Sequence, residues 1–295
     1  PGLWVVGDQW PIQSEIINFN LSSSGQLTDV KTKGTVSVQS PLTTGSASGE
    51  YCVIWCGPDF PTDQRQDDIN SICFDTEPLE NSISILGSSE LKLAITSDQD
   101  CGQVVVRLCD VSPSGSSKRI SYGVLNLAMR NGLDCPKLVV PGEVMDVSIK
   151  LDDTGYEIPV GHRLRLAVST AYFPLIWPAP KKSKLTLDLA SSCLTILCHD
   201  RSAALVRDLG QGYVCPVKKT KKIRPEKHDR VVQTDARDGL VTTKINDDFG
   251  KYTFLEHNLT VGESCKEIHS ILPDDPCSAM SDCSWHAQQS RPGWN

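Results

Sequence analysis

One run of sequence determines the fold that we predict for this chain: Gly161-His162-Arg163-Leu164-Arg165-Leu166-Ala167-Val168-Ser169. Leucine or valine fills every second position from 164 to 168, and arginine or alanine fills the positions between them. Alternation with a period of two is typical of a β-strand that buries one face. Arginine side chains are not buried without partners, so the arginines at 163 and 165 face water or pair with carboxylates.

An aromatic segment follows this strand and contains three large rings within six positions, Tyr172, Phe173 and Trp177. Prolines at 174, 178 and 180 exclude a helix and central-strand pairing here. We therefore expect a platform at the edge of a sheet. The rings either complete the core or form a docking face, because grouped rings that are exposed indicate a partner surface.

Most of the remaining chain consists of short alternating segments separated by turn residues. Clear examples are residues 15–21, 91–97, 103–111, 120–127 and 144–151. A hairpin across Asp238-Gly239 is also expected within 231–245. No long stretch has the 3.6-residue period of an amphipathic helix. Many short strands with turns between them predict an all-β sandwich.

Acidic residues at 63–68 provide partners for the arginines of the first strand. Asp67-Asp68, followed by Ile69, is compatible with a short capped turn. We predict structural salt bridges among Arg65, Asp67, Asp68, Arg163 and Arg165. Adjacent carboxylates can also carry out acid–base chemistry, and we consider this alternative the less favoured one.

The motifs and their order resemble the carboxyl-terminal β-domain of the cocaine esterase/X-Pro dipeptidyl-peptidase hydrolases. Members of that family often read G-H-R-L-R-L before an aromatic-Pro and a Trp-Pro, and D-Q-R-x-D followed by Asp or Glu, as at 63–68 here. A D-D-P-L-S-A segment is usual near the end, and here it reads Asp274-Asp275-Pro276-Cys277-Ser278-Ala279, with Cys277 in place of leucine. The resemblance extends from about Trp4 to about Ala279.

This resemblance implies a jelly roll, or galactose-binding-like β-sandwich. We expect it to form a single domain over 1–295, with a long polar excursion at about 199–232. The family acts through a Ser/His/Asp triad on an α/β-hydrolase domain, whose nucleophile lies in a G-x-S-x-G turn. The sequence contains no G-x-S-x-G and no alternating strand–helix pattern. We therefore expect the α/β-hydrolase domain to be absent, and we assign no catalytic residue.

The function that the resemblance implies is that of an accessory domain in a serine hydrolase with dipeptidyl-peptidase or esterase activity. Such a domain stabilises the catalytic domain and helps wall its substrate pocket, and Tyr172, Phe173 and Trp177 are the candidate docking or pocket-wall residues. The expected partner is the hydrolase domain, upstream in cis or on a separate chain. The main alternative is a free-standing jelly roll that binds carbohydrate or protein. An independent enzyme using a His/Asp site is a third, less favoured reading.

Composition excludes several other partners. The formal net charge is −7, which argues against nucleic-acid binding, and the basic run at 218–224 is read as a solvated loop. No apolar run approaches the roughly 20 residues needed to span a membrane. The chain opens at Pro1 without a signal peptide, so we expect a fragment or a processed product, and a cytoplasmic location is favoured without being established.

The cysteines and histidines do not form a recognisable ligand set. Twelve cysteines are scattered along the chain without a C-x-x-C pair, and we favour buried free thiols over disulfides. His162 is expected to be a structural hydrogen-bonding residue. His257 and His269 could meet only through folding, so a zinc site is the less favoured reading. We predict no metal and no cofactor.

Overall fold

The structure is a computed structural model that describes residues 4–7, 10, 12, 15–55, 57, 59–199, 205–206 and 210–294. The chain divides into two compact units. The first contains residues 1–49 and 61–208, and the second contains residues 50–60 and 209–295. The strands after residue 219 form a sheet of their own. The single domain predicted over 1–295 stays a prediction.

The larger sheet of the first unit contains eight strands in the described part of the chain. The hydrogen-bonded order β10-β7-β13-β2-β3 forms its main path, while β4 and β6 pair with β13, and β11 pairs with β6. Their bounds are β2 (Glu15–Leu21), β3 (Leu27–Thr28), β4 (Thr35–Val38), β6 (Ile83–Gly87), β7 (Glu90–Ser97), β10 (Met145–Lys150), β11 (Thr154–Ile158) and β13 (Leu185–Cys198).

The second layer of this unit is an antiparallel sheet in the order β5-β12-β8-β9. Its bounds are β5 (Ile72–Asp75), β8 (Gln103–Val111), β9 (Ser117–Asn126) and β12 (Arg163–Ser169). The alternating run at 161–169 therefore contains a central strand, β12, paired on both sides. A two-stranded pair, β1 (Val5–Val6) with β14 (Leu205–Val206), completes the unit.

The hydrophobic core lies between these two sheets, as the alternation predicted. Leu164, Leu166 and Val168 of β12 are fully buried in it with side chains of both layers, among them Leu91, Val106 and Leu187. Burying apolar surface contributes roughly 25 cal/mol per Å², so this contact stabilises the unit. These layers confirm the predicted all-β sandwich. The finer jelly-roll topology stays a prediction.

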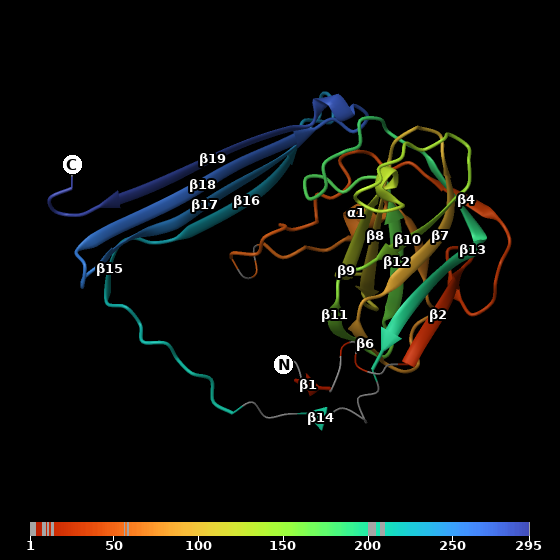
Figure 1. Cartoon of the computed structure of the whole chain (residues 1–295), viewed down its shortest axis with the longest axis horizontal. Coiled ribbons are helices and arrows are strands. Elements are labelled where there is room, and N and C mark those ends of the chain that lie inside the picture. Colours follow the sequence, from red (N-terminus) through yellow and green to blue (C-terminus); the bar gives the residue numbers. More distant parts are fainter. Residues whose placement is uncertain are drawn as a thin grey trace. The chain divides into compact units, whose positions relative to one another are not determined.

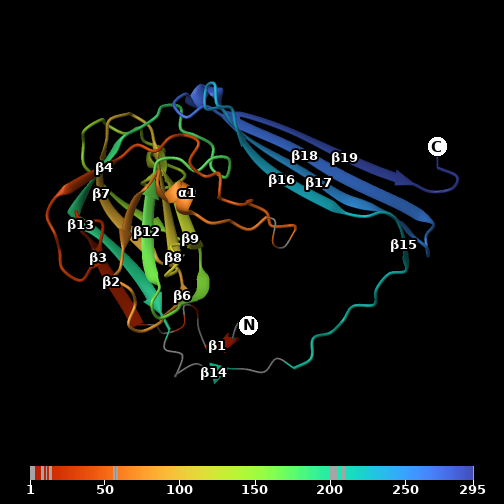
Figure 2. The same cartoon turned by 180° about the vertical axis from the view of Figure 1, so that it is seen from behind.

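The other face of the four-stranded sheet is buried as well. All nine residues of β8 are buried, which happens only when both faces of a strand are covered. Helix α1 (Arg65–Asp68) and the segment at 41–49 provide this cover. Figures 1 and 2 show α1 beside β8, β9 and β12 from opposite sides. Two short 3₁₀ helices, Leu127–Met129 and Pro276–Ser278, complete the described helical elements.

The second unit is a long antiparallel sheet in the order β15-β17-β18-β19, with β16 also paired to β17. Its bounds are β15 (Thr220–Arg224), β16 (Lys227–Thr234), β17 (Val241–Phe254), β18 (Leu259–Ile271) and β19 (Met280–Ser290). The predicted hairpin is present, because β16 and β17 pair across a turn that contains Gly239 at φ 78°. The predicted excursion at 199–232 thus contains β14, β15 and most of β16, while residues 200–204 and 207–209 lie outside the described residues.

Candidate functional site

The acidic segment at 63–68 is held against the sheet by its own turn chemistry. Asp63 Oδ1 accepts hydrogen bonds from the amides of Arg65 and Ser117, which fixes the start of α1. The helix then directs its acidic residues inward, since Asp67 is fully buried and Asp68 is 6% exposed. Buried carboxylates need charged or hydrogen-bonding partners, and both acids find them on the sheet and the covering segment.

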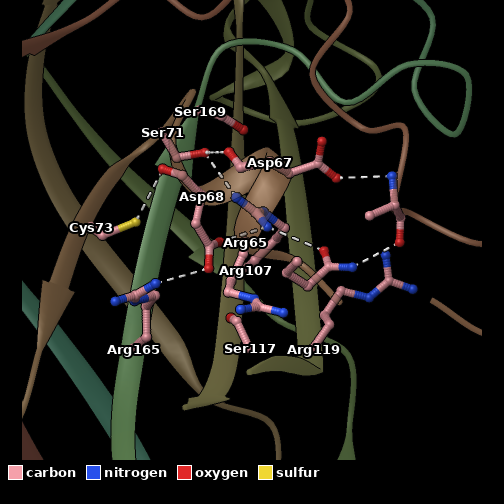
Figure 3. A network of polar contacts seen from close by, with 12 residues as sticks. Arg65, Asp67, Asp68, Ser71, Cys73, Arg107, Ser117, Arg119, Arg165 and Ser169 are labelled. Carbon is pink, nitrogen blue, oxygen red and sulfur yellow. Dashed lines mark hydrogen bonds and ion pairs between the residues drawn. The ribbon is translucent and has the colours of Figure 1, made fainter. Parts of the chain in front are cut away.

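Asp68 is the centre of a buried ion network. Its Oδ1 lies 2.9 Å from Arg107 Nη1, and its Oδ2 lies 2.9 Å from Arg165 Nη1. Arg165 also binds Asp75 in a bidentate pair with two contacts of 2.7 Å, and the two residues are directly opposite each other on β12 and β5. Figure 3 shows Asp68 between the two guanidinium groups. Bidentate charge-assisted pairs of this kind fix geometry as well as adding energy.

Arg107 is the largest fully buried side chain in the described residues. Its Nη1 donates to Gln64 Oε1 at 3.1 Å and its Nη2 donates to Ser71 Oγ at 2.8 Å. Arg107 was not predicted from the sequence as a member of this network. One signal was present, because an arginine inside the apolar run 104–108 indicates a strand with both faces covered and a buried acid nearby.

Asp67 binds backbone amides rather than an arginine. Its Oδ1 accepts from Gly45 N at 2.8 Å and its Oδ2 accepts from Ala47 N at 3.1 Å. Burial raises the pKa of Asp67 above its ordinary value. The predicted salt bridge of this residue is therefore replaced by a clamp on the segment 41–49, because the covering segment brings unpaired amides within reach of the carboxylate.

Arg65 and Arg163 lie at the rim and outside the buried network. Arg65 pairs with its neighbour Asp63 at 2.7 Å, and its side chain is 61% exposed. Arg163 donates to Thr76 O at 2.8 Å and lies 3.5 Å from Glu77. Arg163 shares a face of β12 with Arg165, but it stands at the start of the strand and pairs with the segment that follows β5.

The aromatic segment is divided between the interior and the surface. Tyr172 is fully buried, and its hydroxyl donates to Gln64 Oε1 and accepts from Arg119 Nη1, both at 2.8 Å. Phe173 is 3% exposed, whereas Trp177 is 53% exposed and packs its ring at 5.8 Å from that of Phe173. Tyr172 thus completes the ion network and Phe173 is buried, so these two rings are part of the interior. A docking or pocket-wall role for the segment stays a prediction.

The network's chemistry is that of a scaffold. Asp68 is neutralised by two arginines and Asp67 is engaged by two amides, so neither is poised as a general acid or base. Burial raises the pKa values of the neighbouring thiols Cys73 and Cys109 to about 12, which keeps them protonated and poorly nucleophilic. His162 Nδ1 contacts Asp110 at 2.7 Å, in keeping with the structural role expected of it.

Cysteines and clusters of possible metal ligands are also present outside the ion network. The cysteines that the structure describes are free, with Cys109, Cys198 and Cys265 buried. Among the described residues, two groups have spacing suitable for a metal ion, and both belong to the second unit. No helix in the described part of the chain has the length and apolarity needed to cross a membrane.

The chain matches the profile of a family described as the X-Pro dipeptidyl-peptidase C-terminal non-catalytic domain, over residues 1–228. The chain belongs to this family. The match includes the sandwich and the ion network, and it confirms the resemblance read from the sequence. Residues 229–295, which include β17, β18 and β19, lie beyond the matched range.

Curated relatives of this chain are hydrolases. Cocaine esterase of Rhodococcus sp. (strain MB1 Bresler) is 27% identical over 163 residues, which is 52% of this chain and 28% of the relative. The Xaa-Pro dipeptidyl-peptidase of Streptococcus pneumoniae serotype 19F (strain G54) is 33% identical over 106 residues, 36% of this chain and 14% of the relative. The chain therefore spans less than a third of the length of either relative.

Solved structures show a similar fold. An aminopeptidase from a marine sediment archaeon, Thaumarchaeota archaeon, aligns with a TM-score of 0.55 and 18% identity over 65% of this chain and 38% of that chain. An α-amino acid ester hydrolase aligns with a TM-score of 0.53 and 17% identity over 62% of this chain and 36% of that chain. At these identities, the likeness shows the fold of the chain alone.

Proposed function

We propose that this chain is the accessory domain of a serine hydrolase with dipeptidyl-peptidase or esterase activity. It stabilises the catalytic α/β-hydrolase domain, helps wall the substrate pocket and does no chemistry of its own. The observation that carries this proposal is the family match over residues 1–228, whose description is itself non-catalytic. The relatives named for cocaine and for Xaa-Pro dipeptides suggest the parent substrate class, an ester or a peptide bond after proline.

The buried network supports an accessory role. The acids and thiols that it contains are neutralised, hydrogen-bonded or kept protonated, and the four-stranded sheet is thereby fixed to its covering segment. A rigid outer surface is what a domain needs in order to position part of another domain's pocket. The α/β-hydrolase domain is the partner that this proposal requires, upstream in the same polypeptide or on a separate chain.

A comparison of the recombinant chain with the native protein tests the proposal. We expect the recombinant chain to hydrolyse neither p-nitrophenyl esters nor Xaa-Pro-p-nitroanilides. The native preparation should hydrolyse at least one of them, and an antibody against this chain should remove that activity. Hydrolysis by the recombinant chain at a native rate, or native activity that survives depletion, would contradict the proposal.

Trp177 is the residue of the aromatic segment that we propose for docking, because its ring is half-exposed on the buried base formed by Phe173. In the native enzyme, Trp177→Ala should lower the temperature at which hydrolase activity is lost. Leu133→Ala is the matched control, since Leu133 is an 87% exposed apolar side chain of the same unit. Equal effects of the two substitutions would exclude a docking role for Trp177.

A further inference from the structure

One face of the second unit's sheet carries a buried cluster of acids around a histidine. His228 on β16 lies directly opposite Asp247 on β17, so their side chains share a face. The segment 50–60, which belongs to the same unit, brings Glu50 and Asp59 to this point. The side chains of His228, Asp247 and Asp59 are 8%, 9% and 2% exposed.

The backbone of the 50–60 segment sets the two carboxylates side by side. Glu50 N donates to Asp59 O at 2.9 Å, which closes the segment at its ends. Asp59 Oδ2 accepts from the amides of Ile54 and Trp55, each at 2.6 Å. One oxygen of Asp59 is thus used to hold the carboxylate in place. The other, Oδ1, is buried without a hydrogen-bond partner and lies 3.7 Å from His228 Nε2.

His228 is oriented by the carboxylate behind it. Its Nδ1 makes a hydrogen bond to Asp247 Oδ1, and because a carboxylate only accepts, Nδ1 carries the proton. In the neutral ring, Nε2 then presents a lone pair, and this atom is buried without a hydrogen-bond partner. A carboxylate that binds one ring nitrogen while the other faces a cluster of oxygens is the usual outer-shell arrangement of a metal-binding histidine.

The charges of the cluster also favour a cation. Glu50, Asp59 and Asp247 are opposed by Arg230, whose Nε lies 3.7 Å from Glu50 Oε1 without making a hydrogen bond. Buried carboxylates in such excess are stabilised by pairing or by metal coordination.

We propose that Glu50, Asp59 and His228 bind a divalent first-row transition metal of the zinc class, with Asp247 positioning the imidazole. Their ligand atoms lie within 4.8 Å of one another, and tetrahedral zinc requires separations of roughly 3.3 Å, which small side-chain movements provide. The imidazole ligand favours Zn²⁺ over Mg²⁺ or Ca²⁺, which prefer oxygen alone. Bound metal ties the 50–60 segment to β16. This inference is independent of the proposed function.

A second cluster on the same sheet provides a matched control. Glu267, His269 and Cys283 also have ligand spacing, but both ring nitrogens of His269 are engaged. Nε2 lies 3.0 Å from Glu267 Oε2, and Nδ1 lies 3.0 Å from Ser281 Oγ. His269 therefore offers no unengaged lone pair, and we expect His269→Gln to leave zinc binding unchanged.

The test is calorimetric titration of the full chain with ZnCl₂ after treatment with EDTA. We expect one Zn²⁺ per chain, and loss of at least tenfold in affinity in His228→Gln and Asp59→Asn. The positioning variant Asp247→Asn should lose about 10–100-fold, as outer-shell changes do. Hydrogen exchange of the β16 and β17 amides, measured without metal, shows whether each variant is folded.

Cobalt distinguishes this site from adventitious binding to cysteines. Co²⁺ at a carboxylate–histidine site gives visible absorption without the intense thiolate-to-cobalt charge-transfer band. An absence of Zn²⁺ binding by the folded chain would overturn the proposal. So would a thiolate band, or binding that is lost in His269→Gln and kept in His228→Gln.

Discussion

Asp68 is the residue on which the first unit's polar interior depends. It binds Arg107 and Arg165 at 2.9 Å each. Asp68 is 6% exposed to solvent, and Arg107 is fully buried. Taking such charges from water costs several kcal/mol per ion, which is offset only by close geometry and further hydrogen bonds. Gln64, Ser71 and Asp75 supply those bonds, so removal of one partner leaves a buried charge uncompensated.

Arg107→Met is the substitution that tests this at the residue scale. We expect a loss of about 3 kcal/mol in the free energy of unfolding, near the lower end for a broken buried pair because Arg165 still binds Asp68. Hydrogen exchange of the β8 and β12 amides measures this loss of unfolding free energy for the first unit alone. Arg65→Met is the control, since solvent screens its exposed pair with Asp63. Equal losses in both variants would contradict the account.

Cys109 gives a prediction about pH. Burial raises its pKa from 9.0 to about 12, so above pH 9 the unfolded chain loses a proton that the folded chain keeps. The folded state then binds more protons, and the free energy of unfolding falls as pH rises from about 9 toward 12. Urea unfolding at pH 8, 10 and 11 should show this fall, with a shallower slope in Cys109→Ala. A stability that rises over this range would exclude the explanation.

The sequence could predict some of these residues and not others. The alternation at 161–169 predicted the strand and its buried leucines, because in a strand every second side chain lies on the same face. It could not predict which acid meets which arginine. Asp68 and Arg165 are 97 positions apart, and their pairing depends on how α1 lies on the sheet. The position of the Tyr172 ring could not be predicted either, because the pattern allowed it to lie in the core or at the surface.

At the scale of elements, the segment at 41–49 joins α1 to the sheet. Gly45 has a φ of +117° and donates to Asp67, and a Cβ at this position would lie 2.5 Å from the backbone of Tyr172 and Phe173. Only glycine combines this conformation with so close an approach. The segment is rich in Ser, Thr and Gly, but the need for glycine at 45 arises from the chain 127 residues later.

Gly45→Ala should therefore loosen the segment 41–49 that covers the ion network. We expect faster hydrogen exchange at the α1 amides and a loss of stability larger than in Gly115→Ala. Gly115 has a φ of +86° with no atom within 4 Å of the added Cβ. Its substitution therefore costs only the backbone strain of a left-handed conformation, about 1–2 kcal/mol. A Gly45→Ala variant as stable as Gly115→Ala would show that the close approach does not constrain the fold.

At the scale of the molecule, two compact units account for the chain, and the family match extends through the first and into the second. Short motifs in a shared order predicted the family, because each motif occupies a strand or turn that the sandwich requires. The second unit forms a sheet of its own, which the motifs did not predict. Its strands alternate as those of the sandwich do, and nothing in a period of two shows which sheet a strand joins.

Labelling of the native protein with a fluorophosphonate serine-hydrolase probe, followed by isolation with an antibody against this chain, tests the central claim most directly. The account predicts that the labelled serine hydrolase is isolated as the same polypeptide or in a stable complex with it, and that recombinant chain alone takes up no label. Native chain isolated without any labelled hydrolase, or a label on the recombinant chain itself, would contradict the account.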